Sequence, residues 1–166
     1  MHKFLEYAAR CCEELGLLVS VKNDEAVVFH LPFKRLDYVD CMILPVSDNG
    51  LTFLSVLQAI VPEENVPTLL EYISRLNFGY TYGAFVFNMD MRKLVFQVSN
   101  VFARDAEYEE TEEILRFLIY LGKEAVEGSE DDIADILEGA EDANVLYLRY
   151  KLRRANQRIE ELESKK

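Results

Sequence analysis

Apolar and polar positions along this chain alternate with two different periods, and each period marks a kind of secondary structure. Apolar residues recur every three or four positions over 3–15, over 69–76 and from 107 onward, which predicts helices there. Between these stretches, short runs rich in β-branched and aromatic residues are bounded by turn residues, which predicts strands. The expected strands cover residues 17–21, 26–31, 38–46, 51–61, 83–88 and 93–102.

Short turns join most of these strands. Asn23-Asp24, Asn49-Gly50 and the four residues 89–92 each separate two strand-like runs, as in β-hairpins. Because the strands follow one another without regular β–α–β alternation, the sequence predicts an α+β fold. We expect an antiparallel sheet of five or six strands with helices packed on it, followed by a C-terminal helical extension.

The helical region after residue 107 is expected to divide in two. Ser129 and Asp132 have the spacing of a capping box, which predicts that a new helix opens there. The acid-rich stretch 128–144, with its two glycines, is the weakest join in the chain. We therefore expect an α+β domain over 1–126 and a helical extension over 127–166.

The C-terminal helix carries a heptad repeat. Its apolar residues step by three and four positions through nearly three heptads, as the a and d positions of a coiled coil do. Such a stripe is buried either against the chain's own domain or against a second copy in a dimer, and the sequence leaves both open. The candidate self-association residues are Val145, Leu148, Leu152, Ala155, Ile159 and Leu162.

Charge is distributed unevenly. The chain of 166 residues holds 30 Asp and Glu against 18 Lys and Arg, a net charge of −12. Residues 105–142 hold 15 acids and 2 bases, whereas residues 143–166 hold 3 acids and 7 bases. This acidity argues against nucleic acid and against an anionic membrane surface as partners. We expect the basic segment to lie along the acidic one, within one chain or across a dimer.

Chemically reactive residues form no catalytic or metal-binding motif. Cys11 and Cys12 are adjacent and Cys41 stands alone, which does not match the paired spacing of zinc ligands and favours a reducing cytoplasm. Cys41 and His30 lie on neighbouring expected strands, but an apolar setting would leave that thiol inert. We expect no enzymatic activity, no cofactor and no metal ion.

Aromatic residues gather around the second predicted hairpin. One face of that hairpin should pack under the helices, while the other is a candidate apolar patch for docking a protein. The candidate protein-binding residues are Tyr80, Tyr82, Phe85 and Phe87.

The segment LLEYISRLNFGYTYGAFVFNMDMRKLVFQVSNVF resembles the centre of the YbjN-like family of bacterial regulators. In that family a helix ends near a Leu-Asn pair, here Leu76-Asn77. A Gly–small–Phe strand follows, here Gly83-Ala84-Phe85, and then a polar turn and an outgoing strand, here Leu94-Val95-Phe96. The resemblance covers residues 3–125, whereas the basic heptad tail from Asn144 lies outside it.

This resemblance implies a fold like that of type III secretion chaperones, which are small, acidic, often dimeric α+β proteins that bind extended protein segments. It implies no catalytic residues and no cofactor. We therefore expect a non-enzymatic, protein-binding regulator or chaperone-like protein of the bacterial cytoplasm. The alternatives are a small-molecule sensor or enzyme with a pocket between helices and sheet, and a scaffold that binds through its C-terminal helix.

Overall fold

The computed structural model describes residues 2–140 and 142–165. Its helices and strands, in chain order, are α1 (Lys3–Glu14), β1 (Val19–Lys22), β2 (Val27–Pro32), β3 (Tyr38–Ser47), β4 (Gly50–Leu57), the 3-10 turn η1 (Glu63–Asn65), α2 (Val66–Asn77), β5 (Ala84–Asn88), β6 (Lys93–Val101), α3 (Tyr108–Leu137) and α4 (Ala143–Glu163).

Six strands form one antiparallel sheet in the order β1-β2-β3-β4-β6-β5. Hairpins connect β1 through β4 in sequence, and β5 and β6 form a further hairpin in which β6 pairs with β4. The segment containing α2 carries the chain from β4 to the edge strand β5 before β6 returns beside β4. The sheet and its helices confirm the predicted α+β class.

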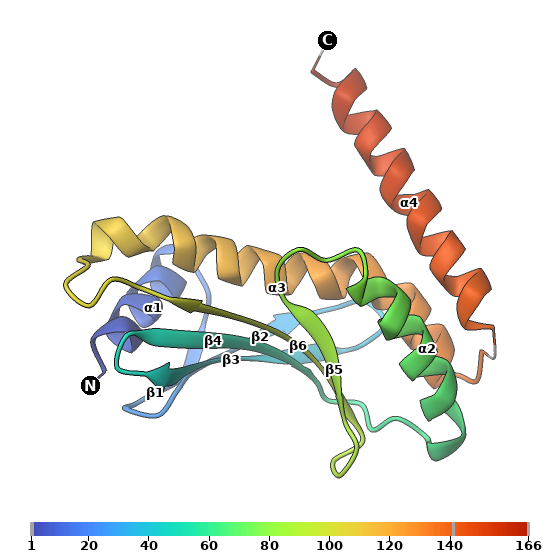
Figure 1. Cartoon of the computed structure of the whole chain (residues 1–166), viewed down its shortest axis with the longest axis horizontal. Coiled ribbons are helices and arrows are strands. Elements are labelled where there is room, and N and C mark those ends of the chain that lie inside the picture. The colour runs from blue at the N-terminus through green and yellow to red at the C-terminus, as the bar shows by residue number, and fades with distance from the viewer. Residues whose placement is uncertain (1, 141, 166) are drawn as a thin grey trace.

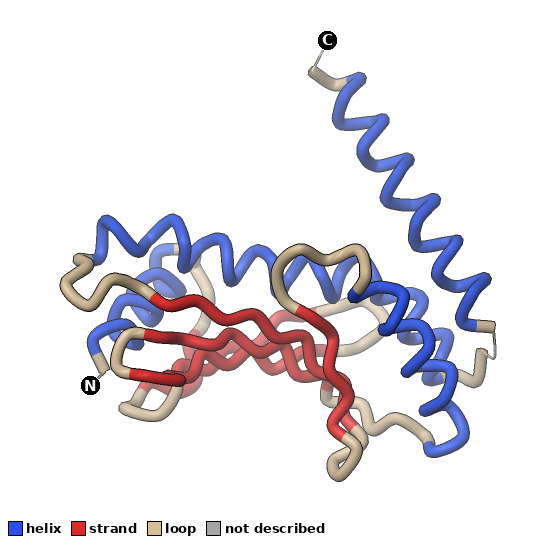
Figure 2. The backbone as a smooth tube through the Cα atoms, viewed as in Figure 1, coloured by secondary structure: helices blue, strands red, loops and turns tan. Residues whose placement is uncertain are grey.

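The helices cover one face of the sheet, as Figure 1 and Figure 2 show for α1 and α3. Side chains alternate along the strands between a buried face and a more open one. In β4, Leu51, Phe53, Ser55 and Leu57 are buried, and the residues between them are only partly covered. The α3 backbone lies directly on the buried face at Gly122, whose Ser55 neighbour donates a hydrogen bond from its hydroxyl to the Gly122 carbonyl at 3.4 Å.

The helix α3 is one uninterrupted element of 30 residues. It begins with a capping box, in which the side chains of Glu107 and Glu110 each accept a hydrogen bond from the other's backbone N–H. The prediction that a new helix opens at Ser129 is wrong. Ser129 is buried inside α3, where its hydroxyl donates to the Ala125 carbonyl at 2.7 Å. The boundary expected between residues 126 and 127 therefore falls within this helix.

The helix α4 extends away from the sheet and the other helices, as Figure 1 shows at the red end of the chain. Within the described part of α4, only Ala143 and Leu146 are buried. The two residues lie in its first turn and pack it beside α2 and α3. Tyr147, Tyr150 and Arg153 are half-buried, and the described part of α4 after Arg153 is exposed.

We predict opposite effects for two glycine substitutions in α3. A Cβ at Gly122 would lie 2.0 Å from Cε1 of Phe53, whereas at Gly128 the nearest heavy atom, of Tyr150, is 3.5 Å away. Gly122→Ala should therefore lower the free energy of unfolding by about 1–3 kcal/mol through overpacking. Gly128→Ala should raise it by about 0.5–1 kcal/mol through helix propensity. Denaturant unfolding followed by circular dichroism measures both, and an unchanged Gly122→Ala midpoint would contradict the close packing.

Candidate functional site

The face of the sheet opposite the helices is largely apolar. Along β2 to β6, the positions that alternate with the buried ones carry aliphatic side chains that are partly exposed. We call this set the open-face patch; its members are Val28, Met42, Leu44, Leu54, Val56, Val86 and Val95.

Strand register makes the open-face patch continuous. Val28 is paired with Met42, and Met42 with Leu54, across β2, β3 and β4. Two residues further along β4, Val56 is paired with Val95 of β6, which is paired in turn with Val86 of the edge strand β5. Directly paired residues on one face are neighbours, so an apolar path crosses five strands by way of Leu54 and Val56. Two polar residues lie directly beside this path, since Leu54 is also paired with Gln97 of β6 and Val56 with Asp40 of β3.

Polar side chains border the open-face patch. On one side, Asp40 accepts hydrogen bonds from His30, at 2.6 Å from Nδ1, and from the amide of Gln58. Lys93 donates to the Gln58 carbonyl oxygen at 3.1 Å and extends this chain across β4 to β6. An apolar area with a hydrogen-bonded polar border is the usual layout of a protein-binding surface.

The four aromatic residues predicted to bind proteins do not lie on the open-face patch. Phe85 is only 2% exposed and belongs to the core, and Tyr80 packs partly buried against it. Phe87 is partly buried beside α2. Tyr82 is 61% exposed, and its ring meets Phe117 of α3 edge to face, with centroids 5.9 Å apart. Of the four, Tyr82 alone offers most of its side chain to a partner.

A signal for the open-face patch is present in the sequence. Strands with one solvated face usually carry polar residues at alternate positions. In β3 and β4 the alternate positions include Met42, Leu44, Leu54 and Val56, so both strands have apolar residues on both faces. This pattern is typical of strands covered on two sides, and here helices cover one side.

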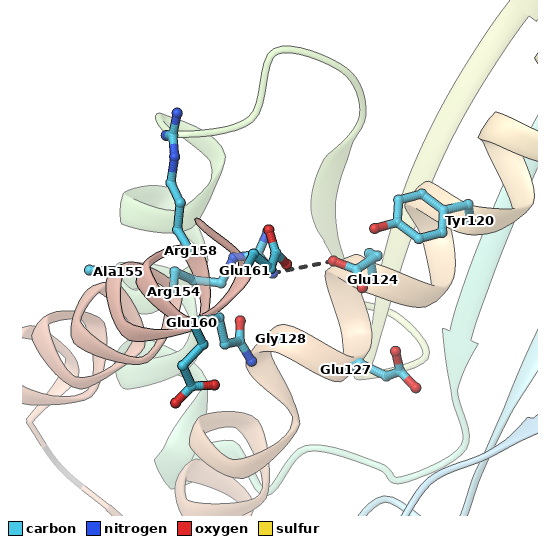
Figure 3. Close-up of a pocket in the computed structure, with 10 residues that line it drawn as sticks. Tyr120, Glu124, Glu127, Gly128, Arg154, Ala155, Arg158, Glu160 and Glu161 are labelled. Atoms are coloured by element: carbon cyan, nitrogen blue, oxygen red, sulfur yellow. Dashed lines mark hydrogen bonds and ion pairs between the residues drawn. The ribbon is translucent and has the colours of Figure 1, made fainter. Parts of the chain in front are cut away.

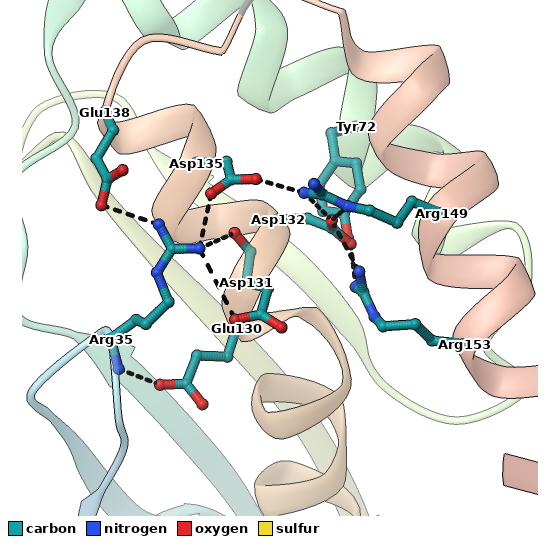
Figure 4. Close-up of polar contacts among 9 residues, drawn as sticks. All are labelled: Arg35, Tyr72, Glu130, Asp131, Asp132, Asp135, Glu138, Arg149 and Arg153. Atoms are coloured by element: carbon teal, nitrogen blue, oxygen red, sulfur yellow. Dashed lines mark hydrogen bonds and ion pairs between the residues drawn. The ribbon is translucent and has the colours of Figure 1, made fainter.

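A buried carboxylate joins three helices and fixes the position of α4 (Figure 4). Asp132 of α3 is fully buried. It accepts a hydrogen bond from the hydroxyl of Tyr72 in α2 at 2.8 Å, and its other contacts are ion pairs with Arg149 and Arg153 of α4. Burial and this carboxylate raise the pKa of Tyr72, which keeps the phenol a donor. The basic segment thus contacts the acidic one within one chain through Arg149, Arg153 and Arg154, but α4 extends away from α3 beyond them and does not lie along it.

The same cluster reaches the connection between β2 and β3. Arg35 donates to Asp135 at 2.7 Å and to Glu138 at 2.9 Å, near the end of α3. Hydrogen bonds from Arg149 and then from Arg35 lower the pKa of Asp135. The end of α3 is thus bonded to the sheet connection on one side and to α4 on the other.

A solvent-open hollow of about 800 Å³ lies where α3 and α4 diverge (Figure 3). Its lining includes Tyr120, Glu124, Arg154, Arg158 and Glu161. Arg154 pairs with Glu124 across the hollow at 3.2 Å. The small-molecule alternative expects a pocket between helices and sheet, whereas this hollow is between two helices and lined mainly by charges. A smaller hollow of about 430 Å³ is lined by Val66 and Pro67 of α2 and by Phe87 of β5.

The candidate Cys–His pair is not assembled. His30 and Asp40 are paired on the open face, and the neighbouring pair, Phe29 and Cys41, points to the core. Burial raises the pKa of Cys41 to about 12 and that of Cys12 to about 12. Across residues 2–140 and 142–165, no three His, Cys, Asp or Glu side chains are placed to hold a metal ion. No helix in those ranges is long and apolar enough to cross a membrane.

Comparisons with known proteins place the fold. No family model matches the chain, and no curated protein matches it in sequence. Among solved structures, the chain is similar in its α+β fold to YbjN from E. coli, which is itself described as a proposed transcription regulator. YbjN aligns with a TM-score of 0.54 and 21% identity over 80% of this chain and 87% of its own. The predicted YbjN-like fold is thus confirmed.

The ExsC–ExsE complex also aligns with the chain. Its TM-score is 0.47, with 17% identity over 73% of this chain and 89% of the other.

We predict that the three cysteines react slowly in the folded protein. Cys11, Cys12 and Cys41 are buried, and burial raises the pKa of the Cys11 thiol to about 11. A thiol reagent at neutral pH should label all three at once only after denaturant is added, because the thiolate is the reactive form. Rapid labelling of any of them without denaturant would contradict the buried placement.

We predict that Asp132→Ala destabilises the fold by about 2–3 kcal/mol, because Tyr72 and two arginines lose a buried acceptor. The matched control is Glu124→Ala, which removes a carboxylate of α3 from an exposed pair with Arg154 and should cost below about 1 kcal/mol. Denaturant midpoints compare the two variants. Equal midpoints would show that the Asp132 cluster does not hold α4.

Proposed function

We propose that this chain is a non-enzymatic, protein-binding regulator or chaperone-like protein of the bacterial cytoplasm, and that its partner docks on the open-face patch. The observation that carries the proposal is the continuity of that patch across five strands on the face opposite the helices. Extended apolar surface of this kind on a folded protein is characteristic of interaction sites.

The geometry defines the chemistry of the partner. The open-face patch consists of Val and Leu side chains and Met42, so a partner segment has to present apolar side chains on one side, as an amphipathic helix or strand does. The polar border from His30 to Lys93 would then meet the polar flank of that segment. The net charge of −12 favours basic partners and speeds their encounter at low salt.

We predict that paired substitutions in the open-face patch abolish partner binding. Met42→Lys with Leu54→Glu places opposite charges on two directly paired residues, so net charge is kept and the strands stay compatible. The matched control is Leu18→Lys with Phe78→Glu, at two highly exposed apolar residues outside the sheet. All three proteins are compared in pull-downs from native bacterial extract read by mass spectrometry.

The wild type and the control should retain the same specific proteins, and the patch variant should lose them. Circular dichroism checks that the patch variant is folded. Retention by the patch variant would move the binding site elsewhere, and an empty wild-type sample would contradict a protein-binding function.

A further inference from the structure

The heptad stripe of α4 is not covered by any other part of the chain that the structure describes. Five of its six residues are between 53% and 62% exposed, and the sixth, Ala155, is also exposed. The stripe consists of Val145, Leu148, Leu152, Ala155, Ile159 and Leu162.

The stripe lies on the side of α4 that faces away from the rest of the chain. Arg149, which lies beside the stripe, contacts Asp132, and the other contacts to α2 and α3 come mainly from Ala143, Leu146, Tyr150 and Arg153. On a helix with 3.6 residues per turn, the centre of the stripe lies about 180° around the axis from these last four residues. The α4 helix of a second copy can therefore lie along the stripe without contacting the sheet and helices of the first copy.

The structure also holds α4 ready for pairing. Most of the stability of a helix in a protein comes from packing rather than from intrinsic propensity, and most of the 21 residues of α4 are exposed. Here the side chain of Asp142 accepts a hydrogen bond from Val145 N–H at 3.0 Å and caps the first turn. Arg149 and Arg153 then tie the next turns to Asp132. The stripe is thus presented on a helix that is already formed, which lowers the entropic cost of association.

The residue types suit a two-stranded coiled coil. With Val145 as the first a position, Leu152 and Ile159 are the other a residues, and Leu148 and Leu162 are d residues. In parallel coiled coils, β-branched residues at a with Leu at d favour two strands over three or four, and the outer a and d positions here follow that pattern. Ala155 at the central d position lets the helices approach closely there.

The flanking charges distinguish parallel from antiparallel pairing. In a parallel pair, each g residue faces the e residue five positions later in the other helix. Arg158 of each copy then faces Glu163 of the other, which gives two ion pairs per dimer. In an antiparallel pair, g faces g, and two of the three g residues of α4, Lys151 and Arg158, are basic while the third is Asn144. Within the described residues, Arg158 and Glu163 have no ion pair inside the chain, so both are available.

We propose that two copies of this chain associate through their α4 helices, paired in parallel along the heptad stripe, with the two bodies on opposite outer sides. This surface is separate from the open-face patch, so the proposal does not rest on the partner-binding function.

The first test is the mass of the full-length protein in solution at micromolar concentrations, by sedimentation equilibrium. The wild type should be a dimer. Leu152→Asp with Ile159→Asp should be monomeric, because both substitutions put charge into the seam. The control, Gln157→Asp with Ser164→Asp, adds the same charge to α4 outside the seam and should remain dimeric. Circular dichroism and thermal unfolding check that the exposed substitutions leave each chain folded.

The second test determines the orientation of the two helices from whether a charge reversal weakens or strengthens the dimer. Arg158→Glu should weaken a parallel dimer by about tenfold, because two attractive pairs become repulsive. Adding Glu163→Arg to that variant should restore the affinity. In an antiparallel dimer, Arg158→Glu would instead relieve the repulsion from Lys151 and strengthen association.

A monomeric wild type would overturn the proposal, and so would a seam variant that stays dimeric, since the contact would then use another surface. A stronger dimer on Arg158→Glu would overturn the parallel arrangement. Loss of the dimer in the seam variant, with weakening by Arg158→Glu and rescue by Glu163→Arg, would establish it.

Discussion

The position of α4 depends on one buried charge, the carboxylate of Asp132. A carboxylate out of contact with water is stable only when cations and donors surround it. Here Tyr72 supplies a donor from α2, and Arg149 and Arg153 supply charge from α4. Moving α4 away would remove both arginines from a buried carboxylate, which is energetically costly. The first turns of α4 are therefore held beside α2 and α3, and this sets the direction of the whole helix.

That fixed direction separates two surfaces of different chemistry. The open-face patch lies on the side of the sheet that the helices leave uncovered, whereas the α4 stripe lies on a helix that extends away from the body (Figure 1). The patch has aliphatic side chains with a polar border, which suits a partner of another kind. The stripe has a heptad repeat with flanking charges, which suits a copy of itself. One chain can therefore use both surfaces at once.

The sequence predicted the features that depend on local patterns. Hairpins at Asn23 and Asn49, most helices and the heptad spacing of α4 all follow from patterns that neighbours in the chain define, whereas the exposure of the heptad residues did not. It misread Ser129 and Asp132 as a cap because their spacing is local, while the contacts that decide their roles come from Tyr72 and Arg149. Phe85 was expected to offer a docking surface, but the helix-covered face of the sheet buries it.

The division of charge in the chain has a structural reason at the join of α3 and α4. The acidic end of α3 brings together Asp132, Asp135 and Glu138, which would repel one another without cations. Arg35 forms ion pairs with these carboxylates from the sheet side, and Arg149 of α4 forms ion pairs with them from the other side. Arg149 and Arg153 of α4 are thus bound to carboxylates of α3, while the g residues Lys151 and Arg158 lie beside the heptad stripe. Because most residues that bind α4 to α2 and α3 lie opposite the heptad stripe, the same helix can pack on its own body and pair with a second copy of the chain.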